Sequence, residues 1–286
     1  MAGIRSRFVE LAGGLRLRVA ESGEETGRPV LLLHGWGASL YMWRAWFAPL
    51  AAAGFRAIAV DLPGHGLSNR PRDRAAYRLR ALVAVVEELI VVERLVSPHV
   101  VAQSMAGTIA LEVALDGRAT IGRLVLINPA QFGVVGLQRV GRLLSPAPVG
   151  RVMHRLVSRW MVARAHRMVY GDPSRITPRD VDEYWAPSQF PSFARAMWRL
   201  VHEFTWTRLP ADVMTERLRS LASPAMVLLA GRDRLVRGAR PYVAALVAAG
   251  APLVVQVVEE GGHAVNEERP EDVVPIVVAF LVGDRT

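Results

Sequence analysis

The chain has 286 residues, of which 51% are apolar, so it is long enough for one large α/β domain or two small ones. It contains no cysteine and no lysine, which excludes disulfides, thiolate chemistry and a lysine base or Schiff base. The net charge is +9, and every one of the 35 basic residues is arginine. The sequence has no helix-turn-helix, RNA-binding or zinc-finger pattern, so we expect no nucleic-acid partner. No apolar run has the length of a signal peptide or membrane span, and a cytoplasmic location is expected.

Strands and helices alternate along most of the chain. Two β-rich runs within 6–22 flank Gly13-Gly14 and predict a hairpin. Further β-rich runs lie at 30–34, 56–60, 98–103, 123–127, 225–230 and 253–258, and helical periodicity occurs at 40–53, 75–95, 105–116, 239–249 and 271–282. This alternation predicts the α/β class: a mostly parallel, doubly wound sheet with ligands at the carboxyl ends of its strands.

Residues 131–212 interrupt the alternation. They contain several helical stretches, no convincing strand and four of the seven tryptophans, and they are too numerous for a loop. We therefore predict a helical cap, or lid, at 131–212, inserted after the sixth strand of a core made of 1–130 and 213–286. Because the alternating pattern resumes at 225, the two parts of the core must share one sheet.

The predicted cap is basic. It contains 12 arginines against six acidic residues, and Arg151, Arg155 and Arg159 follow one another at helical spacing beside an apolar stripe that includes Trp160. One interpretation is a helix that packs its apolar face over the active site and leaves the arginines in water. The other is a surface that attracts anionic substrates or makes a weak contact with an anionic membrane.

Three glycine- or alanine-rich motifs follow predicted strands. The sequence reads HGWG at 34–37, DLPGHGLS at 61–68 and AQSMA at 102–106. In the last of these, Ser104 stands where a strand gives way to a helix, and the residues two before and two after it are small. A sharp turn that lifts a serine above a sheet needs small residues at those two positions.

In this order and spacing, the motifs resemble those of the α/β-hydrolase fold family, and the resemblance covers nearly the whole chain outside the predicted cap. It implies that Ser104 is the nucleophile of a Ser-His-Asp triad. His263, in EEGGH at 259–263, matches the family's base, although a solvent-exposed loop histidine is the alternative. Asp233, in GRDRLV at 231–236, matches the acid, unless it only pairs with Arg232 and Arg234 on the surface.

The resemblance also assigns the residues around the triad. It implies an oxyanion hole formed by the backbone N–H groups of Trp36 and Met105. Asn128 occupies the place where some members carry the acid, but an amide cannot hold that charge. His34 and His65 lie inside the first two motifs and are expected to be hydrogen-bonded scaffold.

These residues predict a serine hydrolase without cofactor or metal that cleaves a small to medium apolar carboxylic ester through an acyl-enzyme. A serine nucleophile argues against haloalkane dehalogenases and epoxide hydrolases, which use aspartate. Two alternatives stay open. A C–C bond hydrolase of ring-fission products would share the triad and the cap, and a hydrolase-like ligand receptor would keep the fold with little turnover.

Overall fold

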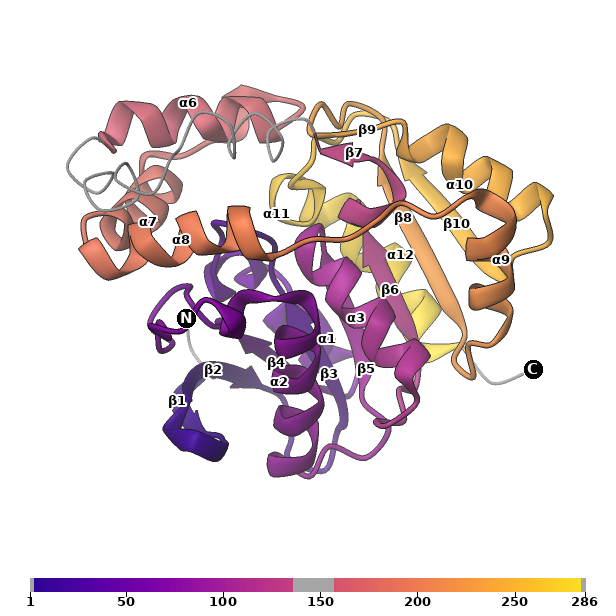
Figure 1. Ribbon diagram of the computed structural model, residues 1–286, viewed down its shortest axis with the longest axis horizontal. Helices are drawn as coiled ribbons and strands as arrows, with labels where there is room; N and C mark the ends of the chain where they lie inside the picture. Colours follow the sequence, from indigo (N-terminus) through magenta and orange to yellow (C-terminus); the bar gives the residue numbers. More distant parts are fainter. Residues whose placement is uncertain (1–2, 136–156, 284–286) are drawn as a thin grey trace.

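The computed structural model describes residues 3–135 and 157–283, which are built around one eight-stranded sheet (Figure 1). The strand order is β1-β2-β4-β3-β5-β6-β8-β10. The strands are β1 (Arg5–Glu10), β2 (Arg16–Ser22), β3 (Arg28–Leu33), β4 (Phe55–Val60), β5 (His99–Gln103), β6 (Leu124–Ile127), β8 (Ala225–Ala230) and β10 (Leu253–Val258). The β1–β2 hairpin and the β2–β4 pair are antiparallel, and the other neighbours are parallel. The predicted α/β class and all eight predicted strands are therefore confirmed.

Helices cover both faces of the sheet because successive side chains of each strand point to opposite faces. In β3, Leu31 and Leu33 face a core that includes α2 (Leu79–Val92), α3 (Met105–Asp116) and α10 (Ala239–Ala248). Val30 and Leu32 face the second core, which includes α1 (Phe47–Ala52) and α12 (Pro270–Val282). All four of these strand side chains are fully buried, so the sheet holds the loops at its carboxyl edge on a rigid base.

Between β6 and β8 the described chain is mainly helical. It contains α6 (Arg159–Val169), the short 3₁₀ turn η6 (Pro173–Arg175), α7 (Pro178–Ser188) and α8 (Pro191–Glu203), which we call the helical insertion. In Figure 1, α6 and α7 lie at the upper left, on the side of the sheet where α11 (Val265–Glu268) is found. The next helix, α9 (Ala211–Arg219), packs against α10. The bounds of the expected cap, 131–212, stay a prediction, since 136–156 lie outside the described residues.

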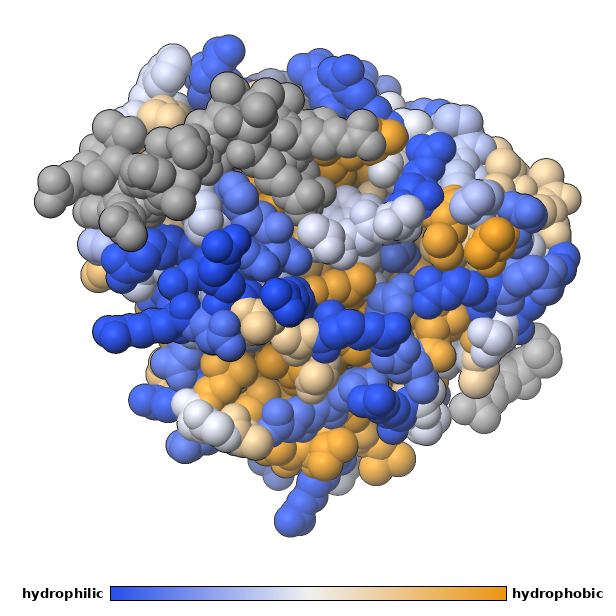
Figure 2. All heavy atoms as spheres, viewed as in Figure 1, coloured by the Kyte–Doolittle hydropathy of each residue, from blue (hydrophilic) through white to orange (hydrophobic). Residues whose placement is uncertain are grey.

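Helix α8 shows how the insertion meets the core. Its buried face consists of Phe193, Ala194, Ala196, Met197 and Leu200, whereas Arg195 on the opposite face is exposed. Figure 2 shows hydrophilic side chains gathered along this part of the surface. The arrangement is that of an amphipathic helix whose apolar stripe packs inward.

Three predictions of local structure need correction. The predicted helix over 40–53 is divided into the 3₁₀ turn η2 (Leu40–Trp43) and α1. A two-residue strand, β7 (Val134–Val135), pairs with β9 (Val236–Arg237), although no strand was expected within the predicted cap, 131–212. The helical spacing of Arg151, Arg155 and Arg159 predicted one helix through all three, and this prediction is wrong. The backbone of Ser158 is extended, and its side chain caps the start of α6 by accepting a hydrogen bond from the Met161 N–H.

The basic stripe is therefore not one helical face. Arg159 donates hydrogen bonds to Asp182 and to the Pro178 carbonyl, while Arg151 and Arg155 lie outside the described residues. Contact with an anionic membrane stays an untested prediction. Across 3–135 and 157–283, no helix is both long and apolar enough to cross a membrane.

Candidate active site

Ser104 occupies the turn between β5 and α3, with φ 54° and ψ −114°. A positive φ is strained for a residue with a Cβ, and the surrounding contacts hold it. The Ser104 N–H donates to the Ile127 carbonyl at 2.9 Å, which fixes the turn to the end of β6. Close packing continues at Gly107, where a Cβ atom would lie 3.0 Å from the Pro129 side chain. The geometry is the sharp strand-to-helix turn that the small residues at 102 and 106 predict.

Ser104, His263 and Asp233 come together at the carboxyl edge of the sheet. His263 Nε2 lies 2.8 Å from Ser104 Oγ, and His263 Nδ1 lies 2.8 Å from Asp233 Oδ2. Ser104 and His263 are buried, and the Asp233 side chain is only 7% exposed, so His263 is not a solvent-exposed loop residue. Arg232 pairs with Glu260, and the carboxylate of Asp233 faces the imidazole.

Asp233 is held as a carboxylate. Its burial alone would raise its pKa, but the interaction with His263 and the hydrogen bonds from the Val236 and Leu235 N–H groups together outweigh that effect and hold the pKa below its usual range. The Leu235 and Val236 N–H groups also donate to Oδ1, at 2.7 and 3.0 Å. An ionised acceptor at Nδ1 selects the imidazole tautomer whose Nε2 is free to accept the proton of Ser104.

Two amide side chains that sequence reasoning had not assigned to the site hold the histidine loop. Gln103 Nε2 and Asn128 Nδ2 each donate to the His263 carbonyl at 3.0 Å. Asn128 also accepts from the Ala230 N–H at 2.9 Å, so it joins the ends of two strands to the loop. The sequence signal that could have found them was their position: Gln103 ends β5, directly before Ser104, and Asn128 directly follows β6, the neighbouring strand.

The HGWG turn lies directly against the strand-to-helix turn that carries Ser104, which we call the elbow. A Cβ atom on Gly35 would be 2.2 Å from Gln103 Oε1 and 3.1 Å from Ser104 Cβ, so any larger residue would have to displace the Gln103 side chain. Within the described residues, the N–H groups of Trp36 and Met105 donate no hydrogen bond to another residue. Their role as an oxyanion hole stays a prediction. The Trp36 side chain is 44% exposed and does not belong to the core.

Two buried histidines shape the neighbouring turns, as predicted. His34 Nε2 accepts a hydrogen bond from the Leu62 N–H at 3.0 Å, and His65 Nε2 accepts one from the Gly37 N–H at 3.1 Å. Their rings meet edge to face, with centroids 4.7 Å apart. Burial lowers the pKa of both, which keeps them neutral acceptors.

The fold and this geometry can be compared with known proteins. A model of the alpha/beta hydrolase family matches residues 30–276. The chain belongs to this family.

Two curated relatives and one solved structure show how far this α/β hydrolase resembles others. The dihydrolipoyllysine-residue acetyltransferase component of the acetoin cleaving system of Pseudomonas putida is 28% identical over 272 residues, which are 94% of this chain and 67% of that protein. A soluble epoxide hydrolase of Corynebacterium sp. strain C12 is 26% identical in an alignment 294 positions long, gaps included, which covers 95% of each chain. A bacterial membrane phospholipase A superposes with a TM-score of 0.79 and 23% identity, covering 98% of this chain and 86% of the other. At 23% identity, the similarity to the phospholipase A structure shows a shared fold only.

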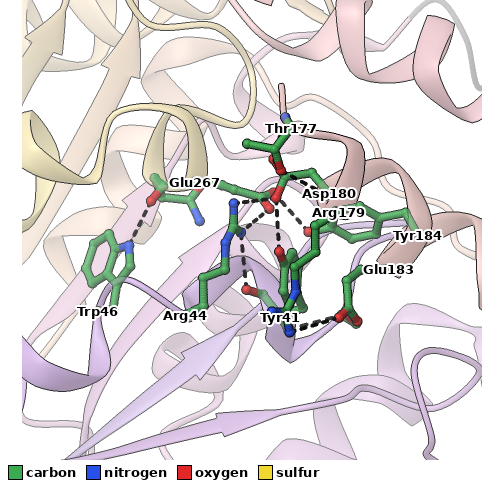
Figure 3. Close-up of polar contacts among 11 residues, drawn as sticks. Tyr41, Arg44, Trp46, Thr177, Arg179, Asp180, Glu183, Tyr184 and Glu267 are labelled. Atoms are coloured by element: carbon green, nitrogen blue, oxygen red, sulfur yellow. Dashed lines mark hydrogen bonds and ion pairs between the residues drawn. The ribbon is translucent and has the colours of Figure 1, made fainter. Parts of the chain in front are cut away.

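A buried ion network joins the helical insertion of this α/β hydrolase to its core (Figure 3). Arg44, just after η2, bonds Asp180 of α7 at 2.7 Å and also Glu267 of α11. The hydroxyl of Tyr41 donates to Asp180 at 3.0 Å, and that of Tyr184 donates to Glu267 at 2.9 Å. One arginine thus connects the chain after the HGWG turn, the insertion and the helix after His263.

The two carboxyl groups of this network differ electrostatically. Burial raises the pKa of Glu267, although Arg44 favours its charged form. Asp180 is also buried, but hydrogen bonds from Thr177 and the charge of Arg44 hold its pKa below the usual range. Thr177 and Asp180 form a capping box at the start of α7, so the helix end and the ion network share one carboxylate.

No group of three or more histidine, aspartate or glutamate side chains in 3–135 and 157–283 has a geometry suited to a metal ion. The side chains gathered around Ser104 instead form a chain of proton donors and acceptors. What this arrangement can support is nucleophilic attack by an activated hydroxyl.

Proposed function

We propose that this α/β hydrolase is a serine hydrolase that cleaves a carboxylic ester of a small to medium apolar substrate. The observation that carries the proposal is the hydrogen-bonded series from Ser104 through His263 to Asp233, with both joining distances at 2.8 Å. A serine hydroxyl is a weak nucleophile unless a base takes its proton, and this series supplies the base and the group that orients it.

In the proposed reaction, Ser104 Oγ attacks the ester carbonyl while its proton moves to His263 Nε2. Asp233 stabilises the imidazolium that forms, without taking its proton. The backbone N–H groups of Trp36 and Met105 donate to the oxyanion of the tetrahedral intermediate. His263 then returns the proton to the leaving alcohol. Water repeats the sequence on the acyl-enzyme and releases the acid.

The apolar character of the substrate is inferred from what packs beside the nucleophile. Met105 belongs to the same buried cluster as Phe132 and as Phe193 and Met197 of α8. Apolar side chains from both the core and the insertion therefore belong to the cluster that includes the residue after Ser104. An acyl or alkyl group bound against such side chains would gain free energy by leaving water.

Serine at the elbow also distinguishes the proposed reaction from epoxide hydrolysis, the activity in the name of the Corynebacterium relative. Epoxide hydrolases of the family use an aspartate nucleophile, which forms an ester that water then cleaves. Ser104 would leave an ether after opening an epoxide, and this triad has no means of hydrolysing an ether. Ester cleavage is thus the reaction that fits the residue present.

The test is a comparison of substrates on the wild-type protein and Ser104→Ala. We expect wild type to hydrolyse p-nitrophenyl acetate, butyrate and octanoate with an initial burst of p-nitrophenol equal to the enzyme present, and the variant to lack that burst. Faster turnover of a vinylogous keto acid than of any ester would assign C–C bond hydrolysis instead. Ligand binding without turnover of either class would identify a receptor.

A further inference from the structure

Glu268, the last residue of α11, lies between the helical insertion and the loop that carries His263. Its side chain is fully buried, and its nearest cation, the Arg269 Nε, is 4.0 Å away. Oε2 accepts the Gly262 N–H at 2.7 Å and the Gly171 N–H at 2.9 Å, while Oε1 accepts the Asp172 N–H at 2.7 Å. A buried carboxylate is stable only with such partners, so these three N–H groups and Glu268 need one another.

The backbones that Glu268 bonds are also in direct contact. A Cβ atom on Gly262 would lie 2.2 Å from the Gly171 N and 2.4 Å from the Tyr170 carbonyl carbon. A Cβ atom on Gly171 would lie 2.5 Å from the Glu260 carbonyl oxygen. Glycine is required on both sides, because any side chain would force the insertion away from the histidine loop.

His263 is consequently held from two directions. On one side of it, the Gly262 N–H bonds Glu268, and on the other the Ala264 N–H donates to the Val169 carbonyl at 3.0 Å. The core holds the His263 carbonyl itself through Gln103 and Asn128. The residues before and after the histidine therefore depend on the segment 169–172, which begins at the last residue of α6 in the insertion.

We propose that Glu268 is a positioning residue for His263, and that segment 169–172 of the insertion is part of the device that aligns the imidazole. This inference rests on the proposed hydrolase function for its kinetic readout. Loss of alignment at a catalytic base lowers the rate of the chemical step more than substrate binding, because the reacting atoms must be near 3 Å apart and correctly oriented. Movement of the insertion at this end would disturb the base directly.

Two substitutions remove the acceptor oxygens of Glu268 in part or completely. Glu268→Gln can keep one oxygen facing Gly262 and Gly171 but presents an amide NH₂ to the Asp172 N–H, so we expect kcat to fall about threefold to tenfold. Glu268→Met has similar length and no strong acceptor, so we expect a fall of up to about 100-fold in kcat with KM nearly unchanged. The matched control is Glu271→Met, which removes an exposed carboxylate that bonds Arg175 of the insertion.

A second readout does not depend on turnover. In wild type, the proton that His263 Nδ1 shares with Asp233 should give a far-downfield resonance in proton NMR, and it should weaken in Glu268→Met and persist in Glu271→Met. If no ester is turned over, the proposed function fails while this resonance still tests Glu268. If Glu268→Met does not fold, amide hydrogen exchange of the wild-type protein still tests the proposal. The amides of Gly171, Asp172 and Gly262, which share the Glu268 carboxylate, should then exchange with one common opening free energy.

The proposal is overturned if folded Glu268→Met keeps the wild-type kcat and the downfield resonance. It is equally overturned if Glu271→Met loses as much activity as Glu268→Met, because the loss of any contact with the insertion would then lower the activity. Rapid exchange at Gly171 and Asp172 beside a protected Gly262 would also contradict it, because the three amides would then not share the carboxylate.

Discussion

His99 makes the stability of the fold depend on pH. It is the first residue of β5, is fully buried, and among the described residues has no hydrogen-bond partner for either ring nitrogen. Burial, reinforced by the charges of Arg28 and Arg123, lowers its pKa from 6.5 to about 4. Since the folded pKa is the lower one, the unfolded chain binds a proton at a pH where the folded chain does not. The stabilisation is complete above pH 6.5 and is lost as the pH falls toward 4.

The size of the effect follows from the pKa difference. At about 1.4 kcal/mol per pKa unit, the shift corresponds to about 3 kcal/mol of unfolding free energy, of which most is lost by pH 4.5. Urea unfolding of wild type and His99→Leu at pH 7.5, 6.5, 5.5 and 4.5 measures it. We expect the variant to gain about 2–3 kcal/mol relative to wild type between the highest and lowest pH. Parallel pH profiles for the two proteins would refute the assignment of this dependence to His99.

Other predictions concern the site. Ser104→Ala should fold normally by circular dichroism and lose ester turnover, with a residual acceleration of about 10³–10⁴ over water from the oxyanion hole; a wild-type kcat/KM would show that another nucleophile acts. Asp233→Asn should lower kcat by up to about 10⁴, because an amide does not select the required His263 tautomer, and a nearly silent change would place the acid elsewhere. Gly35→Ala should lower both kcat and the melting temperature, since its Cβ atom would overlap Gln103 Oε1, and unchanged values would mean that the turn has room. Activity measured after treatment with EDTA should equal untreated activity, and a loss restored by a divalent metal would contradict the metal-free reaction.

The sequence predicted the features that local pattern specifies. β-rich runs marked every strand of the main sheet, and parallel strands necessarily bring their carboxyl ends to one edge. The residues of the triad lie at that edge because each follows such a strand. Ser104 was further marked by its small neighbours, which its positive φ explains.

What the sequence did not predict depends on contacts between distant segments. Asn128 was considered only as a missing acid, whereas it holds the His263 carbonyl from the end of β6. Glu268 is an ordinary helical glutamate in the sequence, and its three backbone partners come from two other segments. The start of α6 was misplaced because apolar periodicity continued through Ser158, although that residue caps the helix.

We have proposed that His263 and Asp233 activate Ser104 as a nucleophile. Labelling with a fluorophosphonate probe followed by peptide mass spectrometry tests it most directly, with His263→Ala as the comparison. We expect one label per chain, located on Ser104, and labelling of His263→Ala slower by orders of magnitude. A folded wild-type protein that takes no label on Ser104, or a His263→Ala variant labelled at the wild-type rate, would contradict it.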